Sequence, residues 1–273
     1  MSTLVSDRPA ATPAMPPDLA GHMAMLKERV FQTETRWPQF NRLLTDLPQI
    51  ASSLPKGAKV VALERTILYG GISLFAPFFR EQEFVSVDCS PAEADVRGAY
   101  NAHMVDDPRT IRIPYSRRGT EVDTGLADGF ADVVLVPNLV HHIADQQKLV
   151  GEMARVVKPG GQVYVFEPIV RELHQIPEDY LRYTPFGLAQ VMEGHQLRME
   201  SYELEGGPFQ AIAYCWDQAL QYFPADKRPE MERWFFTEHF PQLMKWDVEN
   251  PNNLVRKHTS FPVAFSLLAR KIG

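Results

Sequence analysis

The chain has 273 residues, of which 45% are hydrophobic, and a formal net charge of −6 at pH 7. This size supports one large domain with a substantial core, and the acidic balance, without a dense Lys and Arg stripe, argues against a nucleic-acid partner. The two cysteines, Cys89 and Cys215, exclude a disulfide framework and agree with a cytoplasmic location. Apolar runs stay shorter than about 18 residues, so we expect no membrane span.

Residues 1–18 are rich in Pro, Ala, Ser and Thr, a composition typical of a disordered arm, and they lack the pattern of a signal peptide. Residues 19–55 carry apolar side chains at helical spacing and predict two N-terminal helices that pack on the core. These side chains are Met23, Leu26, Val30, Trp37, Phe40, Leu44 and Leu47.

From residue 56 onward, short apolar strands alternate with helical patterns. The predicted strands are residues 59–63, 83–87, 132–137, 162–166, 198–203 and 262–269, with an edge strand at 102–105. The predicted helices are residues 144–157 and 185–193. This alternation implies right-handed crossovers and a parallel sheet, so residues 56–205 with 261–273 are expected to form an α/β core. The KPGG sequence at 158–161 is expected to form a tight turn between helix and strand.

Residues 206–260 interrupt the connection between the last two predicted strands and are rich in aromatic side chains. Two interpretations are open for this insertion. It is a helical lid that excludes water and shapes an acceptor pocket, or it is a plain helical layer or a dimer face. The aromatic residues are Phe209, Tyr214, Trp216, Tyr222, Phe223, Trp234, Phe235, Phe236, Phe240 and Trp246.

Residues 129–168 read GFADVVLVPNLVHHIADQQKLVGEMARVVKPGGQVYVFEP. The order of strand, histidine segment, helix, KPGG turn and acid-ending strand resembles the second half of class I S-adenosylmethionine-dependent methyltransferases of the small-molecule type. The stretch RELHQIPEDYLRYTPFGLAQVMEGHQL is similar to a subgroup tied to glycan or natural-product pathways. The resemblance covers residues 56–205 and the last strand. It implies a doubly wound, mostly parallel seven-stranded α/β sheet with an antiparallel last strand.

The resemblance also implies S-adenosylmethionine as cofactor, bound at the carboxyl ends of the strands. The family's first loop reads acidic-x-Gly-x-Gly-x-Gly. Here Glu64 takes the acidic position and Gly70 the position of the third glycine, whereas Thr66 and Leu68 replace the first two glycines. Either these side chains narrow the approach to the cofactor, or the loop no longer binds it.

Asp88 ends the second predicted strand, where a carboxylate can accept both hydroxyls of a ribose. A helix N-cap is the alternative role for Asp88. By resemblance, Asp106 or Asp107 lies beside the adenine, with a surface-loop role as the alternative, and Asn138 lies near the methionine end of the cofactor.

Methyl transfer is an in-line displacement in which alignment of the reactants supplies about 7–11 kcal/mol of the barrier. A hydroxyl acceptor also needs a base, and the candidates are His142, Glu167 and His174, each with a structural role as the alternative. We predict no metal site, because adjacent His141 and His142 lack the i, i+4 spacing of a helical metal site.

The sequence therefore favours a methyltransferase that acts on O or N of a small molecule or a glycan-type acceptor. A non-methylating pseudoenzyme or binding protein on the same fold is the main alternative, because the glycine loop is altered. A dehydrogenase is a third interpretation, since nicotinamide sites also combine a loop with a strand-end acid. The same missing glycines argue against it.

Overall fold

A computed structural model of the protein describes residues 18–34, 37–66, 71–89, 109–112, 122–174, 176–249 and 261–273. These residues form a seven-stranded sheet in the order β3-β2-β1-β4-β5-β7-β6. Strands β1 to β5 pair in parallel, and β7 runs antiparallel to both β5 and β6. The strands are β1 (Lys59–Glu64), β2 (Glu83–Asp88), β3 (Thr110–Arg112), β4 (Ala131–Pro137), β5 (Val157–Pro168), β6 (Leu197–Glu205) and β7 (Ala264–Lys271).

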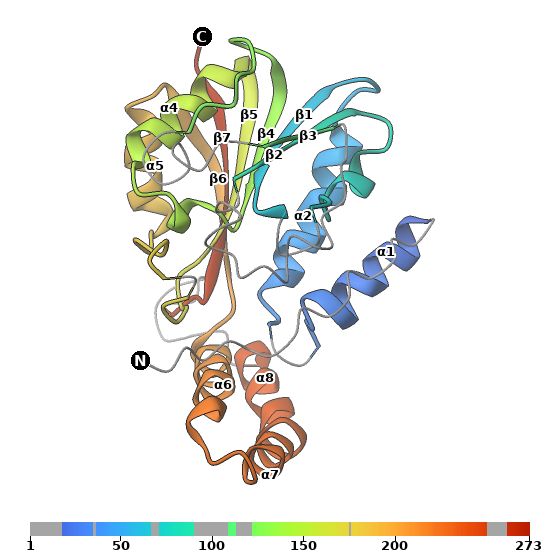
Figure 1. The fold of residues 1–273 in the computed structure, drawn as a ribbon, viewed down its shortest axis with the longest axis vertical. Helices are drawn as coiled ribbons and strands as arrows, with labels where there is room; N and C mark the ends of the chain where they lie inside the picture. The colour runs from blue at the N-terminus through green and yellow to red at the C-terminus, as the bar shows by residue number, and fades with distance from the viewer. Residues whose placement is uncertain are drawn as a thin grey trace.

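Helices cover both faces of the sheet, as the predicted doubly wound fold requires (Figure 1). On one face lie α4 (Gln146–Val156) and α5 (Pro185–Glu193); on the other lie α1 (Leu19–Met25), its π-helical continuation η1 (Leu26–Val30) and α2 (Phe40–Ser53). A short 3₁₀ helix, η3 (Ala76–Phe79), joins the α2 side. Because both faces are buried, alternate residues of one strand enter two separate hydrophobic clusters. The central strands therefore read as continuous apolar runs.

The predicted strands coincide with or overlap the observed strands, with two differences. The edge strand expected at 102–105 lies outside the described residues, and β3 forms at Thr110–Arg112. The KPGG sequence lies within β5, where Ala131 pairs with Val157 and Val133 already pairs with Gln162. This bulge needs a glycine at Gly161, because a Cβ there would lie 2.8 Å from the carbonyl oxygen of Asp132.

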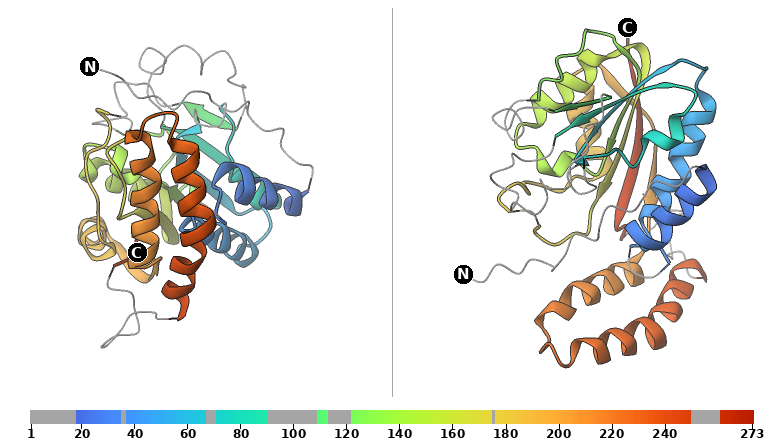
Figure 2. Two further views of the ribbon diagram at one scale, coloured as in Figure 1. Left: turned by 90° about the horizontal axis from the view of Figure 1, so that it is seen from below. Right: turned by 45° about the vertical axis from the view of Figure 1, so that its right-hand side comes forward.

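The insertion leaves the sheet at the carboxyl edge of the parallel strands. Glu205, the last residue of β6, and Pro168, the last residue of β5, both pair with Ala264. The described part of the insertion is helical, as expected, and forms a hairpin beyond this edge (Figures 1 and 2). Its elements are α6 (Pro208–Ala219), η6 (Leu220–Tyr222), α7 (Arg228–Arg233), the π-helical η7 (Trp234–His239) and α8 (Phe240–Glu249).

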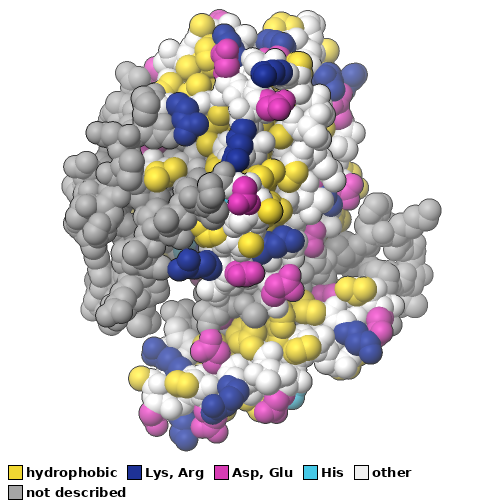
Figure 3. All heavy atoms as spheres, turned by 90° about the vertical axis from the view of Figure 1, so that its right-hand side faces the viewer, with side chains coloured by type: hydrophobic (Ala, Val, Ile, Leu, Met, Phe, Trp, Pro, Cys, Tyr) yellow, Lys and Arg dark blue, Asp and Glu magenta, His cyan; other side chains and the backbone are white. Residues whose placement is uncertain are grey.

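Many aromatic side chains of the insertion pack against one another. Ala213, Phe235 and Phe240 form a small cluster of their own, with Trp216 and Phe236 packed against it. Acidic and basic side chains are interspersed over the face shown in Figure 3. In the ranges that the structure describes, every helix is too short or too polar to cross a membrane.

Candidate active site at the carboxyl edge of the sheet

Two carboxylates lie side by side at the ends of β1 and β2, where Glu64 and Asp88 are register partners. Both side chains are buried. Oδ1 of Asp88 accepts a hydrogen bond from the backbone N–H of Thr66 at 3.2 Å, and the Ser86 hydroxyl donates to Oε1 of Glu64 at 2.7 Å. The parallel register therefore brings two of the predicted cofactor residues together.

Burial raises the pKa of Glu64 to about 7, and the neighbouring Asp88 carboxylate acts in the same direction. The hydroxyls of Ser73 and Ser86 oppose this shift, because they hydrogen-bond to the charged form. Near neutral pH, Glu64 is thus present in both protonated and ionised forms.

A small cavity of about 30 Å³ lies between the ends of β1 and β4, with room for about two water molecules. Glu64, Arg65, Asn138 and His142 contribute its polar lining. Asn138 has the left-handed backbone conformation, with φ of 61°, which asparagine tolerates better than most residues. This conformation turns the chain from β4 into the short 3₁₀ helix η5 (Val140–His142).

Several residues of the predicted cofactor site lie outside the described residues. These are Leu68, Gly70, Asp106 and Asp107, so the roles expected of them stay predictions. Arg65, which sequence reasoning did not single out, is almost fully buried beside the cavity. Its guanidinium group lies 3.3 Å from Oε2 of Glu178, which links the end of β1 to the loop after β5.

Glu167, at the end of β5, holds η5 in place. Its Oε1 accepts from the backbone N–H of Val140 at 2.7 Å, and its Oε2 lies 2.6 Å from Nδ1 of His141 and 3.4 Å from that residue's backbone N. Both oxygens are therefore engaged by the protein, and Glu167 orients His141. His141 was not among the predicted catalytic residues, since nothing local in the sequence distinguishes it from His142.

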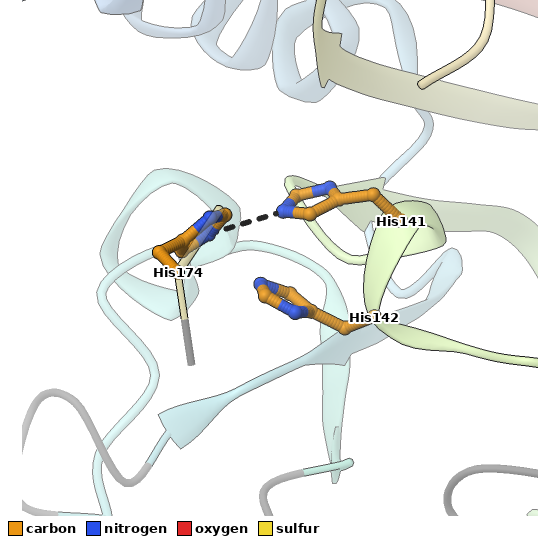
Figure 4. A group of neighbouring side chains, drawn as sticks. All are labelled: His141, His142 and His174. Atoms are coloured by element: carbon orange, nitrogen blue, oxygen red, sulfur yellow. Dashed lines mark hydrogen bonds between the residues drawn. The ribbon is translucent and has the colours of Figure 1, made fainter. Parts of the chain in front are cut away.

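The rings of His141, His142 and His174 meet at this point (Figure 4). His142 Nδ1 lies 2.5 Å from the carbonyl oxygen of Glu178, and His174 Nδ1 lies 3.1 Å from that of Glu172. Burial lowers the pKa of His142 far below its usual value, with a further contribution from His141. Burial and the nearby Arg171 lower the pKa of His174 to about 4, so both rings are neutral near pH 7.

The insertion contacts the loop that carries His174. The Tyr214 hydroxyl of α6 donates to Oε2 of Glu172, and burial raises the pKa of Tyr214. The Arg171 guanidinium lies 5.8 Å from the Trp37 ring centroid and 6.0 Å from that of Tyr214. These contacts join the N-terminal region, the insertion and the loop after β5.

Comparison with known proteins identifies the domain. Residues 71–165 match a family described as a methyltransferase domain. Residues 71–165 are therefore similar to a methyltransferase domain, within a sheet whose strand order is the one expected for that fold. An uncharacterized methyltransferase from Mycobacteroides abscessus is 30% identical over 137 residues, which cover 48% of this chain and 51% of that protein. Another, from Mycobacterium sp. (strain JLS), is 33% identical over 121 residues, which cover 44% of this chain and 42% of that protein.

The chain thus spans about half the length of the curated relatives it matches. Among solved structures, the methyltransferase domain resembles the [4+2]-cyclase SpnF, with a TM-score of 0.50 and 14% identity over 88% of this chain and 85% of that one. This likeness concerns the fold alone. S-adenosylmethionine is the cofactor of the family that the domain matches.

The polar groups at the ends of β1 and β2 suit this cofactor. Asp88 offers a buried carboxylate at the position where nucleoside-binding folds hold a ribose diol. The Thr66 hydroxyl is buried and has no hydrogen-bond partner among the described residues, so it is available to a ligand. The residues present therefore fit the cofactor in chemistry.

Proposed function

We propose that the protein transfers a methyl group from S-adenosylmethionine to an oxygen or nitrogen atom of a small-molecule or glycan-type acceptor. The observation that carries the proposal is the buried Asp88 carboxylate beside Glu64, at the carboxyl ends of β2 and β1 in this sheet order. Asp88 would hold the ribose, and Asn138 would line the methionine end. Gly70 and Asp107 are proposed to complete this cofactor site, as the family pattern implies.

When bound, the cofactor supplies an activated methyl group, so the chain must orient the acceptor and remove its proton. His142 is proposed to accept that proton, because its Nδ1 lies against a carbonyl oxygen, which leaves a lone pair on Nε2; the burial that lowers its pKa makes it a weak base. His174 is oriented in the same way by the carbonyl of Glu172. Glu167 acts through His141, which it positions with its carboxylate.

We further propose that the insertion (206–260) is a lid over the acceptor. It leaves the sheet at the edge where ligands bind in doubly wound folds, and Tyr214 reaches the loop of His174. A homodimer interface would bury the same exposed Trp234 and Trp246. A variant with a shortened insertion distinguishes the two roles. If the insertion is a lid, this variant keeps its cofactor affinity and its oligomeric state but loses turnover. If the insertion is an interface, light scattering shows that the oligomer has dissociated.

A second candidate function is binding without methyl transfer. The cavity of about 30 Å³ between β1 and β4 is far smaller than the roughly 300–1,000 Å³ typical of ligand pockets, and Thr66 and Leu68 stand where the family has glycines. This candidate predicts that S-adenosylhomocysteine fails to bind.

Calorimetry with S-adenosylhomocysteine decides between the two candidates. We expect saturable binding by the wild type. Asp88→Ala should weaken binding by about 10- to 100-fold, because a hydrogen bond to a charged group contributes roughly 1.5–3 kcal/mol. Asp128→Ala, at a surface carboxylate outside the site, is the matched control and should leave affinity unchanged. Absence of binding by the folded wild type at millimolar ligand would favour the second candidate.

A further inference from the structure

The three histidines come from two separate segments that the sequence alone does not bring together. His141 and His142 end the 3₁₀ helix after β4, and His174 lies in the loop after β5. One ring nitrogen from each lies within 4.8 Å of the other two. The adjacent pair alone lacks the spacing of a helical metal site, and His174 adds a third ring from a separate segment.

Each of the three rings has its Nδ1 atom against a protein acceptor. His141 Nδ1 lies 2.6 Å from Oε2 of Glu167, and His142 Nδ1 lies 2.5 Å from the carbonyl oxygen of Glu178. His174 Nδ1 lies 3.1 Å both from the carbonyl oxygen of Glu172 and from Oδ2 of Asp179. An imidazole that donates from Nδ1 carries a lone pair on Nε2, so the three Nε2 atoms are all acceptors.

The Nε2 atoms of His141 and His174 lie 3.4 Å apart. Two lone pairs at that distance repel each other unless a metal ion or a shared proton lies between them. Zn–N distances of about 2.0–2.1 Å place two nitrogens of a tetrahedral zinc site about 3.3–3.4 Å apart. The observed pair therefore already has the separation of two zinc ligands.

We propose that His141, His142 and His174 bind a Zn²⁺ ion through their Nε2 atoms, and that the fourth position is open to water or to an oxygen atom of the acceptor. Three histidines with one open position form a known type of catalytic zinc site. One ring nitrogen of each histidine lies within 4.8 Å of the other two, so the three rings must draw closer to reach the tetrahedral spacing.

The groups around the cluster supply the outer hydrogen bonds that such sites need. A carboxylate on the far nitrogen of a ligating histidine fixes the ring and raises its basicity, and Glu167 and Asp179 stand in this position. The guanidinium groups of Arg65 and Arg171 are paired with Glu178 and Glu172, which offsets their positive charge. Zn²⁺ also prefers imidazole nitrogen, and all three rings are buried or nearly so.

The zinc site rests on the histidine geometry and stands whether or not the protein is a methyltransferase. Where the proposed function also holds, the ion would replace His142 and His174 as the group that activates the acceptor, because a zinc-bound Nε2 has no free lone pair. An acceptor hydroxyl on the open position would then lose its proton to solvent as its oxygen forms the bond to the methyl group. The methyl–sulfur bond breaks, and the sulfur keeps the electron pair, so charge and atoms balance. Zinc lowers the pKa of a bound hydroxyl, which is the activation an alcohol acceptor needs.

The test is a titration of chelator-treated, tag-free full-length protein with Zn²⁺ by calorimetry, and with Co²⁺ by visible absorption. We expect one ion per chain and the intense visible bands of tetrahedral cobalt. His174→Ala and His142→Ala should each weaken zinc binding by at least about 100-fold, since loss of a ligand exceeds the 10- to 100-fold cost of losing an outer-shell partner. His195→Ala is the matched control, because its Nε2 lies 2.9 Å from Gln147 outside the cluster.

Two results would overturn the proposal. One is the lack of saturable zinc or cobalt binding by folded wild type at about 100 µM metal, which would assign the 3.4 Å contact to a shared proton. The other is unchanged affinity in His174→Ala. If His142→Ala fails to fold, zinc binding by His174→Gln tests the proposal instead. His174 lies in a loop, so this substitution should leave the fold intact. The titration contains no cofactor and no acceptor, so its failure leaves the methyltransferase test above untouched.

Discussion

The carboxyl edge of the sheet has two halves that are built differently. At the ends of β1 and β2, Glu64 and Asp88 lie next to each other because of strand register alone, and the loop that follows departs from the glycine pattern of its family. At the ends of β4 and β5, Glu167 and the three histidines are fixed by contacts that span 26 to 36 residues of sequence. Strand register positions the side chains of the first half, and long-range hydrogen bonds position those of the second.

The largest expected effect concerns the second half. Glu167→Ala removes the acceptor of the Val140 and His141 groups and leaves buried donors without a partner. We expect the free energy of unfolding to fall by about 3–5 kcal/mol, as for other broken buried charged networks. Urea unfolding measures it, and Glu200→Ala, in an exposed pair with Arg270, should change stability by less than about 1 kcal/mol. A loss below that of the control would contradict the role of Glu167.

The next largest effect concerns Glu64, in the half of the edge formed by β1 and β2. Glu64 has a folded pKa of about 7 against 4.5 for the free side chain, so the folded state binds a proton that the unfolded state releases between these values. The stabilisation of the folded state by protonated Glu64 is fully present below pH 4.5. As the pH rises from 4.5 to about 7, the free energy of unfolding falls by at most about 3 kcal/mol. Glu64→Gln should remove this slope. Urea titrations of both proteins at pH 5, 6 and 8 give the difference, and parallel curves would exclude the shift.

A smaller effect is expected where the insertion joins the second half. Tyr214→Phe removes the hydroxyl that donates to Glu172, which should cost about 1–2 kcal/mol of stability. Tyr222→Phe, at a residue that is 80% exposed, is the matched control and should be neutral. Thermal unfolding of the two variants and the wild type makes the comparison. Equal midpoints for all three would mean that the contact with Glu172 contributes nothing.

The smallest effect concerns the altered loop. Replacing both Thr66 and Leu68 by glycine removes the bulk that narrows the approach to the cofactor and also removes the Thr66 hydroxyl, so S-adenosylhomocysteine binding should tighten by no more than about 1 kcal/mol or stay unchanged. Calorimetry on the double variant measures it after circular dichroism has established that it folds. Weaker binding by a folded double variant would show that these side chains hold the cofactor.

The difference between the halves also explains what could be predicted from the sequence. Apolar periodicity located the strands, and helix α5 (Pro185–Glu193) was predicted at its observed bounds, because local spacing determines such elements. Glu64 and Asp88 were each predicted at the end of a strand in the cofactor site, and the parallel register of the structure makes them neighbours. The role of His141 was missed because it depends on Glu167 and His174, which lie 26 and 33 residues further along the chain. Periodicity carries no information about such contacts.

The link between the insertion and the histidine loop has a thermodynamic consequence. Arg171 lies between the Trp37 and Tyr214 rings, and the next residue, Glu172, accepts from Tyr214 and from His174. A ligand that shifted the insertion would therefore change the contacts that orient His174. Coupling free energies are reciprocal, so a ligand at His174 alters affinity at the insertion by the same factor. Among the described residues, Arg171 and Glu172 would carry this coupling.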